Sequence, residues 1–457
     1  MIWHFPASAH AAAFPHARAV SIDGDAHTWR TLMTRAAHLQ PVWERTLKPD
    51  ARVMLPAERS LRFVEHFVAL IRAGRHVVLV SPEATDGELQ HAREVAAVTD
   101  FAPLSSLPAL EAQIDAPATH AAPWAPDRAL LSVLTSGTTG LPKAITLRAE
   151  QVIFSSLGSA ARLGALPTDR WHAPLPLHHV GGIMVLLRAL IFGFEAEYTS
   201  HFNVAQSAER LRSAEVTLAS FVPVMLERIL EENPDLRGPA TLRAILLGGA
   251  ATPPRLLERA ARANLPIARS WGMSETASQI ATAAPGDFDS PLAPLPFAAV
   301  ELLRGRLVID GPQALDGRFT SADRGEVTPE GVHIHGRADD IFISGGENVD
   351  PVEIERVLTA HPQVENALVI GVPSRRWGHK AVAFVVANAL SVEALRMHCE
   401  DALEKFKIPK SFYFVPDIPR SGMGKPSRML AMRDWQTHYA NRDEQLDCST
   451  ASSGEGS

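Results

Sequence analysis

The sequence has 457 residues, more than one compact core usually accommodates, so we expect two or three domains. Hydrophobic residues make up 46% and charged residues 21%, which is ordinary for a globular protein. The formal net charge is -7, and no long run of Lys and Arg is present. This balance gives no reason to expect nucleic-acid binding, although a locally basic pocket for an anionic small molecule remains compatible with it.

The two cysteines, Cys399 and Cys448, lie far apart, which excludes a disulfide framework and gives no zinc-like spacing. Such sparse cysteine usage fits a reducing cytoplasm, which is the location we expect. The N-terminus lacks the basic start and apolar core of a signal peptide. The apolar stretch at residues 181–194 is broken by Arg188 and is too short to span a bilayer, so we expect no membrane-spanning segment.

Apolar runs alternate with amphipathic stretches through the first three quarters of the chain. The apolar runs predict strands at residues 52–55, 76–80, 129–134 and 244–247, and the amphipathic stretches predict helices at 61–73 and 204–214. This alternation predicts α/β layers with partly parallel sheets. Beyond a connector at 336–340, the pattern predicts helices at 351–360 and 392–406 and strands at 364–372 and 381–386. These elements suffice for a small α+β domain of about 100 residues.

A loop of small and hydroxylated residues follows the strand predicted at 129–134. It reads Thr-Ser-Gly-Thr-Thr-Gly-Leu-Pro-Lys from Thr135 to Lys143. Gly137 and Gly140 remove steric bulk, so backbone N–H groups can converge on phosphate oxygens, and Lys143 adds a positive charge. Further donors are the hydroxyl groups of Thr135, Ser136, Thr138 and Thr139. The spacing differs from a Walker P-loop, and by composition alone the segment could be a surface hairpin.

The complete string resembles the phosphate loop of the adenylate-forming superfamily, which contains acyl- and aryl-CoA ligases, luciferases and peptide-synthetase adenylation domains. The resemblance recurs in the family's order from residue 131 to residue 428. It implies an enzyme that uses ATP and Mg²⁺ to activate a carboxylate as an acyl-adenylate, with CoA as a further co-substrate. It also implies a large domain of layered α/β sheets with a small β-barrel part at 1–337, a small mobile α+β domain at 338–440 and a disordered tail at 441–457.

Two further motifs resemble the family's nucleotide site. The Leu-Gly-Gly-Ala-Ala string at 247–251 is similar to the strand and turn that line the adenine and acyl pocket, which assigns Gly249 and Ala250 to ATP binding. The Ser-Trp-Gly-Met-Ser-Glu-Thr string at 270–276 is similar to the Tyr-Gly-x-Thr-Glu signature. Trp271 stands where the family has tyrosine, which implies that Trp271 and the adjacent Gly272 lie beside the adenine. Ser274 stands where the family has threonine, which implies that its hydroxyl contacts phosphate. Glu275 matches the magnesium ligand, since Mg²⁺ prefers carboxylate oxygen. A strand-to-helix turn with a helix cap would be the plain structural alternative.

Three motifs in the last third match family residues that contact ribose, phosphate or CoA. By resemblance, Asp323 binds both ribose hydroxyls and Arg337 contacts ribose or phosphate. Asp339 matches the hinge about which the small domain rotates. The glycine loop that meets the pantetheine arm of CoA corresponds to Gly345 and Gly346.

Lys425, in the string Pro-Arg-Ser-Gly-Met-Gly-Lys at 419–425, matches the catalytic lysine on a mobile glycine loop. An exposed lysine without a role is the usual alternative. At about 4 Å and an effective dielectric constant of about 20, one charge pair contributes roughly 4 kcal/mol. We therefore expect Lys425 to accelerate adenylation and to matter much less for thioester formation, because the small domain would swing it away.

The acid-binding residues are expected between residues 173 and 223. His179 matches a family histidine that gates the acyl and pantetheine channels, and His178 replaces an aromatic neighbour. Arg188 interrupts an apolar run, so its side chain must either reach water or pair with an anion. Here the resemblance extends to the o-succinylbenzoate-CoA ligases of menaquinone synthesis, which have an arginine in this register and a pocket residue that matches Ser220. It implies that Arg188 holds the second carboxylate of the acid.

Other functions remain open. Another aryl- or medium-chain acyl-CoA ligase would not need the Arg188 cation. An amino-acid adenylation domain usually has an aspartate near His178 and His179, and a non-catalytic nucleotide-binding protein would be expected to lose Lys425 or Glu275. The expected partners are a small carboxylic acid, ATP and CoA, without nucleic acid, and a homodimer is left open.

Overall fold

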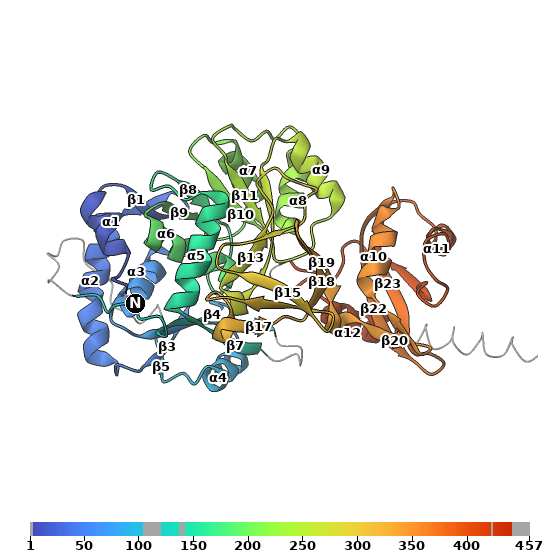
Figure 1. The fold of residues 1–457 in the computed structure, drawn as a ribbon, viewed down its shortest axis with the longest axis horizontal. Coiled ribbons are helices and arrows are strands. Elements are labelled where there is room, and N and C mark those ends of the chain that lie inside the picture. The colour runs from blue at the N-terminus through green and yellow to red at the C-terminus, as the bar shows by residue number, and fades with distance from the viewer. Residues whose placement is uncertain (1–2, 104–119, 137–141, 422–423, 441–457) are drawn as a thin grey trace, which may run out of the picture. The chain divides into compact units, whose positions relative to one another are not determined.

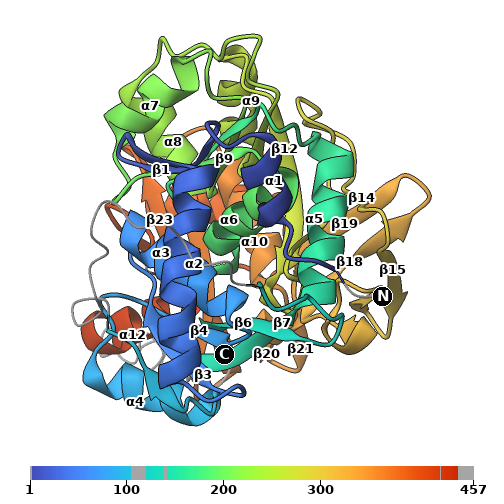
Figure 2. The same cartoon turned by 90° about the vertical axis from the view of Figure 1, so that its left-hand side faces the viewer.

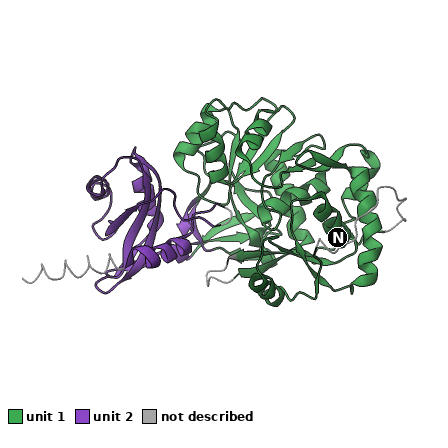
Figure 3. Cartoon of the chain, turned by 180° about the vertical axis from the view of Figure 1, so that it is seen from behind, with its two compact units in different colours: residues 1–303, 307–321, 327–333 green, residues 304–306, 322–326, 334–457 purple. Residues whose placement is uncertain are grey.

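The computed structural model describes residues 3–103, 120–136, 142–421 and 424–440. The predicted loop residues Gly137, Thr138, Thr139 and Gly140 and the predicted tail lie outside these ranges. Contacts divide the chain into two compact units (Figure 3): residues 1–303, 307–321 and 327–333 form unit 1, and residues 304–306, 322–326 and 334–457 form unit 2. The domain limits inferred above, with a division after residue 337, stay a prediction.

The largest sheet of unit 1 is mainly parallel (Figure 1). Its strands follow the order β14-β13-β12-β11-β10-β8-β9-β1-β2, and the six from β12 to β1 run parallel. Its strands are β1 (Arg18–Ile22), β2 (Asp25–Thr28), β8 (Arg170–His172), β9 (Glu195–Tyr198), β10 (Leu218–Phe221), β11 (Ala244–Leu247), β12 (Ile267–Met273), β13 (Ser278–Thr282) and β14 (Ala293–Pro294). Because β8 lies between β9 and β10, segments far apart in sequence meet in this sheet.

A second sheet of unit 1 has the order β5-β3-β4-β6-β7 and carries the predicted phosphate loop between β6 and β7. Its strands are β3 (Arg52–Pro56), β4 (His76–Val80), β5 (Asp100–Phe101), β6 (Ala129–Ser136) and β7 (Pro142–Arg148). The predicted strands at 52–55, 76–80, 129–134 and 244–247 are confirmed as β3, β4, β6 and β11. They form because runs of Val, Leu and Ile in these segments become buried on both faces.

Helices pack on both sheets of unit 1. They are α1 (Ala7–Ala13), α2 (Trp29–Thr46), α3 (Leu61–Arg72), α4 (Asp86–Val95), α5 (Ala149–Leu163), α6 (Val180–Phe192), α7 (Val204–Arg212), α8 (Pro223–Glu232) and α9 (Pro254–Arg262). The helices predicted at 61–73 and 204–214 are confirmed as α3 and α7. Ser60 and Asn203 cap them, because each side chain accepts a hydrogen bond from the backbone N–H of the third helical residue, Phe63 in α3 and Gln206 in α7. Figure 2 shows α2 and α3 side by side, and their apolar residues belong to one large core.

Smaller strands follow the large sheet in the chain. They form a three-stranded sheet of β15 (Ala299–Leu303), β16 (Arg306–Asp310) and β17 (Arg318–Thr320), and a pair of β18 (Asp323–Thr328) and β19 (Gly331–Arg337). Short 3-10 helices are η2 (Ser274–Thr276), η3 (Leu315–Gly317) and η4 (Ala338–Asp340). In the described residues these strands form open sheets and not a closed barrel.

Unit 2 is a five-stranded sheet covered by helices. Its strands are β20 (Phe342–Ser344), β21 (Glu347–Val349), β22 (Val364–Ser374), β23 (Gly378–Ala387) and β24 (Ser411–Phe414), and its helices are α10 (Pro351–Ala360), α11 (Val392–Glu400) and α12 (Arg428–His438). The predicted α+β pattern is confirmed, with one correction. The helix predicted at 392–406 ends at Glu400, because the Ala402 and Leu403 N–H groups both turn back to the Cys399 carbonyl and Leu403 then enters the core.

The α/β fold class is therefore confirmed. Among the helices that the structure describes, none has the length and apolar character that crossing a membrane would require.

Candidate active site

The predicted site residues of unit 1 gather where parallel strands of the large sheet end. His178 and His179 follow β8, Ser220 lies near the end of β10, and Gly249 follows β11. At the end of β12, Trp271 precedes η2, which contains Glu275. Because these strands are parallel neighbours, their carboxyl ends meet at one edge of the sheet. Open α/β sheets bind their ligands at this edge, so the topology brings the predicted nucleotide and acid residues together.

Glu275 and Lys143 form an ion pair across 132 residues of sequence. The Lys143 Nζ donates to Glu275 Oε1 at 2.5 Å, and the carboxylate side chain is only 11% exposed. Gln151 from α5 supports this corner by donating to the Glu275 carbonyl at 3.3 Å. The predicted phosphate-loop lysine and the predicted magnesium ligand are therefore adjacent, at the base of the loop after β6. At the same place the Thr135 hydroxyl is buried without a hydrogen-bond partner in the described residues, and Ser136 ends the strand.

The residues predicted to face the adenine lie on backbone whose conformation and close packing require glycine at two positions. Gly249 has φ +86, which L side chains rarely adopt. A Cβ at Gly272 would lie 1.9 Å from the Ser278 carbonyl oxygen, so only glycine allows β12 and β13 to approach there. Trp271, on the same strand, is 7% exposed, while Ala250 and Ser274 are half-buried. This backbone can approach a flat ring closely.

The donor set at Glu275 fits one magnesium ligand. Its Oε2 makes no hydrogen bond within the described part of the chain, so one carboxylate oxygen remains available. No group of three or more His, Cys, Asp or Glu side chains with metal-binding geometry occurs in the described residues. Mg²⁺ is commonly held by one or two carboxylates with phosphate oxygens and water, which matches a single Glu275 beside a phosphate loop.

Arg188 lies in the middle of α6, where every residue from Gly182 to Leu190 is buried. The Arg188 side chain is 1% exposed, so the alternative in which it reaches the surface is wrong. Its Nε and Nη2 atoms have no hydrogen-bond partner among the described residues. Burial lowers the Arg188 pKa to about 10, and the Tyr198 phenol partly opposes this shift. A charged group with unused donors this deep in a protein calls for an anionic partner.

Two strand residues hold Arg188 and Ser220 in one cluster. The Arg188 guanidinium lies 5.6 Å from the centre of the Trp171 ring, and Trp171 Nε1 donates to Ser220 Oγ at 2.8 Å. The Tyr198 hydroxyl donates to the Gly182 carbonyl at 3.0 Å, which ties β9 to the first turn of α6. Trp171, Tyr198 and Ser220 come from three adjacent strands, β8, β9 and β10. Two of the predicted acid-binding residues, Arg188 and Ser220, therefore contact the same indole, that of Trp171.

The two histidines between β8 and α6 pack against each other, with ring centroids 4.1 Å apart. Burial, with a smaller contribution from the Arg59 charge, lowers the His178 pKa to about 4, so this imidazole is neutral at pH 7. His178 Nδ1 has no partner within the described residues, whereas His179 precedes α6 and has contacts of its own. Arg59 donates to the Pro174 carbonyl at 3.3 Å, which places a further cation next to the pair.

In unit 2, the predicted ribose and hinge residues surround η4. Asp323 begins β18 and is half-buried, and Arg337 ends β19. The Asp339 carboxylate accepts from Arg306 at 3.2 Å and pairs with Arg337 at 3.5 Å. The Ala338 N–H donates to the Ala322 carbonyl at 2.7 Å, which fixes the connector to the strand that carries Asp323.

Gly345 and Gly346 form the two-residue turn between β20 and β21. Their φ values are +60 and +93, as a tight hairpin turn of this kind requires. The Gly345 N–H donates to the Trp377 carbonyl at 2.8 Å. The predicted CoA loop is therefore a glycine turn beside the Trp377 indole.

Lys425 lies next to a backbone bridge between Arg420 and Pro426. Its carbonyl accepts from the Ser421 N–H at 2.8 Å. Burial lowers the Lys425 pKa, and the Arg337 charge lowers it further. Lys425 is half-buried, so it is not an ordinary exposed lysine.

Sequence reasoning missed Trp171, Tyr198 and Arg59. The residues around Trp171 are mostly polar and predicted no strand, and the bond from Trp171 to Ser220 depends on β8 pairing with β10. The single sequence contains no signal for that pairing. Arg59 follows β3 and resembles an ordinary surface arginine in the sequence.

The family described as AMP-binding enzyme matches residues 92–311, and its C-terminal domain matches residues 353–425. The chain belongs to this family of adenylate-forming enzymes, as the loop and its companion motifs predicted.

Among curated relatives, the 2-succinylbenzoate--CoA ligase of Geobacillus kaustophilus (strain HTA426) is 36% identical over 324 residues, which cover 64% of this chain and 66% of that protein. The enzyme of the same name from Bacillus licheniformis is 34% identical over 333 residues, which cover 66% and 69%. The chain thus spans about two thirds of the length of the curated relatives it matches. The predicted resemblance to this subfamily is confirmed.

Solved structures show the same fold. The o-succinylbenzoate CoA synthetase (MenE) from Bacillus subtilis in complex with the acyl-adenylate intermediate OSB-AMP is 26% identical, with a TM-score of 0.82 over 94% of this chain and 98% of that chain. The same enzyme in complex with ATP and magnesium ion matches with a TM-score of 0.82 over 95% of this chain and 100% of that chain.

Proposed function

We propose that this protein is an ATP-dependent acid-CoA ligase that converts o-succinylbenzoate, ATP and CoA to o-succinylbenzoyl-CoA, AMP and pyrophosphate. The observation that carries this proposal is the buried guanidinium of Arg188, whose Nε and Nη2 have no partner in the described residues and which lies over the ring of Trp171, the residue that donates to Ser220. Membership in the AMP-binding family supports the reaction type, and the similarity to 2-succinylbenzoate--CoA ligases supports the acid.

The proposed reaction has two steps. First, a carboxylate oxygen of the acid attacks the α-phosphate of ATP and pyrophosphate leaves. Then the CoA thiol attacks the carbonyl carbon of the adenylate, the bond to AMP breaks, and the thiol proton is released. No side chain needs to form a covalent intermediate.

The nucleotide residues would bind and orient ATP. Lys143 and the loop after β6 would contact the phosphates, and Trp271 would lie along the adenine. Glu275 would hold Mg²⁺, which neutralises phosphate charge when bound. Formation of that site would require Lys143 to leave Glu275 Oε1 and turn to phosphate, and its 53% exposed side chain leaves room for this movement.

Arg188 would determine the choice of acid. The o-succinylbenzoate molecule has two carboxylates, one on the succinyl chain and one on the ring. If the ring carboxylate pairs with Arg188, the succinyl carboxylate is the one activated. Guanidinium pairs strongly with carboxylate, and Ser220 can donate its hydroxyl proton because its oxygen already accepts from Trp171. An acid without the second carboxylate would leave the buried Arg188 charge without this partner.

Residues of unit 2 would serve the two steps in turn. Lys425 would stabilise charge on the phosphates during adenylation. A rotation about Asp339 would then remove Lys425 and present the turn at Gly345 and Gly346 to the pantetheine arm. Asp323 and Arg337 would contact the ribose. Because ATP and CoA are both substrates, we propose the cytoplasm as the place of reaction.

A CoA-ligation screen tests this proposal. The purified protein would receive ATP, Mg²⁺, CoA and one acid at a time: o-succinylbenzoate, benzoate, chlorobenzoates or fatty acids. We expect o-succinylbenzoate to give the highest kcat/KM, with AMP formed in equal amount to thioester. A higher kcat/KM for benzoate or a fatty acid would contradict the proposed acid, and ATP turnover without AMP would contradict the proposed chemistry.

A further inference from the structure

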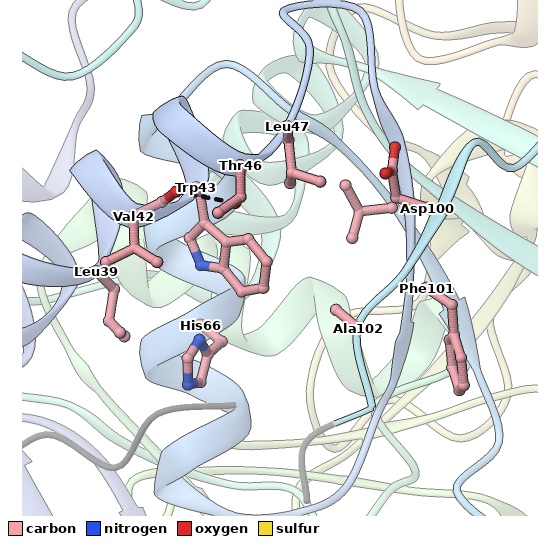
Figure 4. Close-up of a pocket in the computed structure, with 10 residues that line it drawn as sticks. Leu39, Val42, Trp43, Thr46, Leu47, His66, Asp100, Phe101 and Ala102 are labelled. Carbon is pink, nitrogen blue, oxygen red and sulfur yellow. Dashed lines mark hydrogen bonds between the residues drawn. The ribbon is translucent and has the colours of Figure 1, made fainter. Parts of the chain in front are cut away.

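Two features of the structure involve none of the predicted site residues. One is a cavity of about 260 Å³ in unit 1, which mainly apolar side chains line (Figure 4). The described residues of this lining identify no ligand. The other is a cluster of charged side chains in unit 2, formed by Asp340, Glu355 and Arg428. Because Arg428 follows Lys425 closely in the sequence, this cluster adjoins the loop that carries the lysine.

The loop that carries Lys425 is closed at its base and leads directly into α12. The Ser427 N–H donates to the Pro419 carbonyl at 2.8 Å, and the Ser421 N–H donates to the Lys425 carbonyl at 2.8 Å. The Ser427 hydroxyl caps α12 by accepting from the Leu430 N–H at 3.3 Å. These bonds join both ends of the loop to the first turn of the helix, so the backbone of Lys425 should follow the position of α12.

Arg428, the first residue of α12, pairs with two carboxylates from other elements. Its Nε lies 3.3 Å from Asp340 Oδ2 in η4, and its Nη2 lies 3.0 Å from Glu355 Oε1 in α10. The three side chains are 22%, 27% and 17% exposed, so solvent screens these pairs less than it screens surface pairs. Asp340 directly follows Asp339, the proposed hinge. One guanidinium therefore joins the helix after Lys425 to the connector.

The apolar packing of α12 does not depend on these pairs. Leu368 and Ile370 of β22 share a core with α12, whereas Val369 belongs to the core under α10, because alternate strand residues point to opposite faces. The order β21-β20-β23-β22 leaves β22 at an edge of the sheet, where Glu355 Oε1 accepts from the Val369 N–H at 2.8 Å. The pair of Arg428 with Glu355 thus joins two helices whose apolar residues belong to different cores.

We propose that Arg428 is a positioning residue, which holds the loop of Lys425 in a fixed place relative to the connector so that the ammonium meets the phosphates during adenylation. Because Asp340 follows the proposed hinge at Asp339, the three charged side chains would turn together and their pairs would persist in both half-reactions. Loss of the pairs should therefore impair only the step that needs Lys425. This inference rests on the proposed ligase function and adds a residue to its first step.

The rates of the two half-reactions of the full-length protein test the inference. Acid-dependent exchange of pyrophosphate into ATP reports adenylation, and thioester formation from supplied adenylate reports the second step. We expect Arg428→Gln to lower kcat of exchange about tenfold, as loss of a hydrogen-bonded charge implies, with KM for ATP and thioester formation within about twofold of the wild type. Assays at about pH 8.5 keep Glu355 ionised, because burial raises its pKa to about 7.

Lys407→Gln is the matched control. It breaks another ion pair of α10, between Lys407 and Glu353 at 2.9 Å, which involves neither the connector nor the loop of Lys425. Both half-reactions of this variant should run at the wild-type rate. Asp340→Asn leaves the pair of Arg428 with Glu355 in place, so it should lower exchange by about threefold and spare thioester formation. This milder variant decides the question if Arg428→Gln does not fold.

A double-mutant cycle shows whether Arg428 acts through Lys425. In the Lys425→Ala background, Arg428→Gln should lower the remaining exchange no further, because the lysine that it positions is already absent. A residue that only stabilises unit 2 would still lower exchange in that background, and it would lower thioester formation as well.

Three results would overturn the inference. One is an equal loss of both half-reactions in a folded Arg428→Gln or Asp340→Asn protein. Another is exchange in these variants as fast as in Lys407→Gln. The third is a tenfold loss from Arg428→Gln in the Lys425→Ala background. Failure of the proposed function would differ from all three, because the wild type would then exchange pyrophosphate with another acid and not with o-succinylbenzoate, and the variants would be compared with that acid.

Discussion

Replacing Arg188 with methionine should make the ligand-free protein more stable and the enzyme much poorer. Arg188 is buried, and its pKa falls from 12.5 to about 10, which disfavours its charged form by about 3 kcal/mol at 1.36 kcal/mol per pKa unit. Methionine removes this cost at pH 7, where the folded state would otherwise bury the charge. The contact with the Trp171 ring, worth about 2 kcal/mol when desolvated, is lost at the same time. The expected net gain is therefore about 1 kcal/mol.

The activity should change in the opposite direction. Removing one partner of a buried charge pair costs about 2–5 kcal/mol, so kcat/KM for o-succinylbenzoate should fall roughly 30- to 4,000-fold. Thermal unfolding without ligands measures the first effect, and a coupled AMP assay measures the second. A gain in stability with a loss of activity is the signature of a residue kept for ligand binding.

Arg170→Met is the matched control. Arg170 lies on β8 and pairs with Oε2 of the buried Glu195 at 2.7 Å, so its loss leaves this oxygen without that partner, although Ser21 still donates to Oε1, and should lower the melting temperature. Arg188→Met should raise the melting temperature by a degree or more, as about 1 kcal/mol implies. If Arg188→Met destabilised the protein as Arg170→Met does, Arg188 would have a structural partner and the reasoning would be refuted. Unchanged kinetics with o-succinylbenzoate would refute the binding role.

Three further predictions concern Lys425 and the Trp171 bond. Lys425→Ala should reduce acid-dependent pyrophosphate exchange about a thousandfold but spare thioester formation from supplied adenylate, and equal loss of both would contradict the hinge account. Burial and the Arg337 charge lower the Lys425 pKa below its usual value of 10.5, so pyrophosphate exchange should fall at high pH as the ammonium loses its proton. Arg337→Met should move this fall in activity to higher pH, and a fall that stays at the same pH would argue against an effect of Arg337 on Lys425. Trp171→Phe should raise KM for o-succinylbenzoate about fivefold at unchanged kcat. Ser220→Ala should cost less in the Trp171→Phe background than in the wild type, because the bond from Trp171 that orients the Ser220 hydroxyl is already lost; fully additive losses would show that the two residues act independently.

Local sequence patterns predicted most elements correctly. The strands β3, β4, β6 and β11 follow from short Val, Leu and Ile runs, because burial on both faces of a sheet needs no alternation. Helix α11 ended earlier than its pattern suggested, because Leu403 is apolar and buried without being helical. The spacing of apolar residues indicates which positions are buried, but a residue in a turn can be buried as well.

The candidate site was predictable only in part. The motif residues Lys143, Glu275 and Lys425 could be found in the sequence because their spacing is local. The ion pair between Lys143 and Glu275 could not, since it joins β7 of one sheet to η2, which follows β12 of the other, across 132 residues. The same holds for Trp171, which reaches Ser220 only because β8 lies between β9 and β10. Strand order in a sheet is a property of the whole chain.

The acid specificity of the wild-type protein tests the central claim most directly. We would measure kcat/KM for o-succinylbenzoate and for 4-phenyl-4-oxobutanoate, which is the same acid without the ring carboxylate. Pairing of that carboxylate with the buried Arg188 predicts a preference of roughly 30-fold or more for o-succinylbenzoate. Equal kcat/KM values for the two acids would contradict the account.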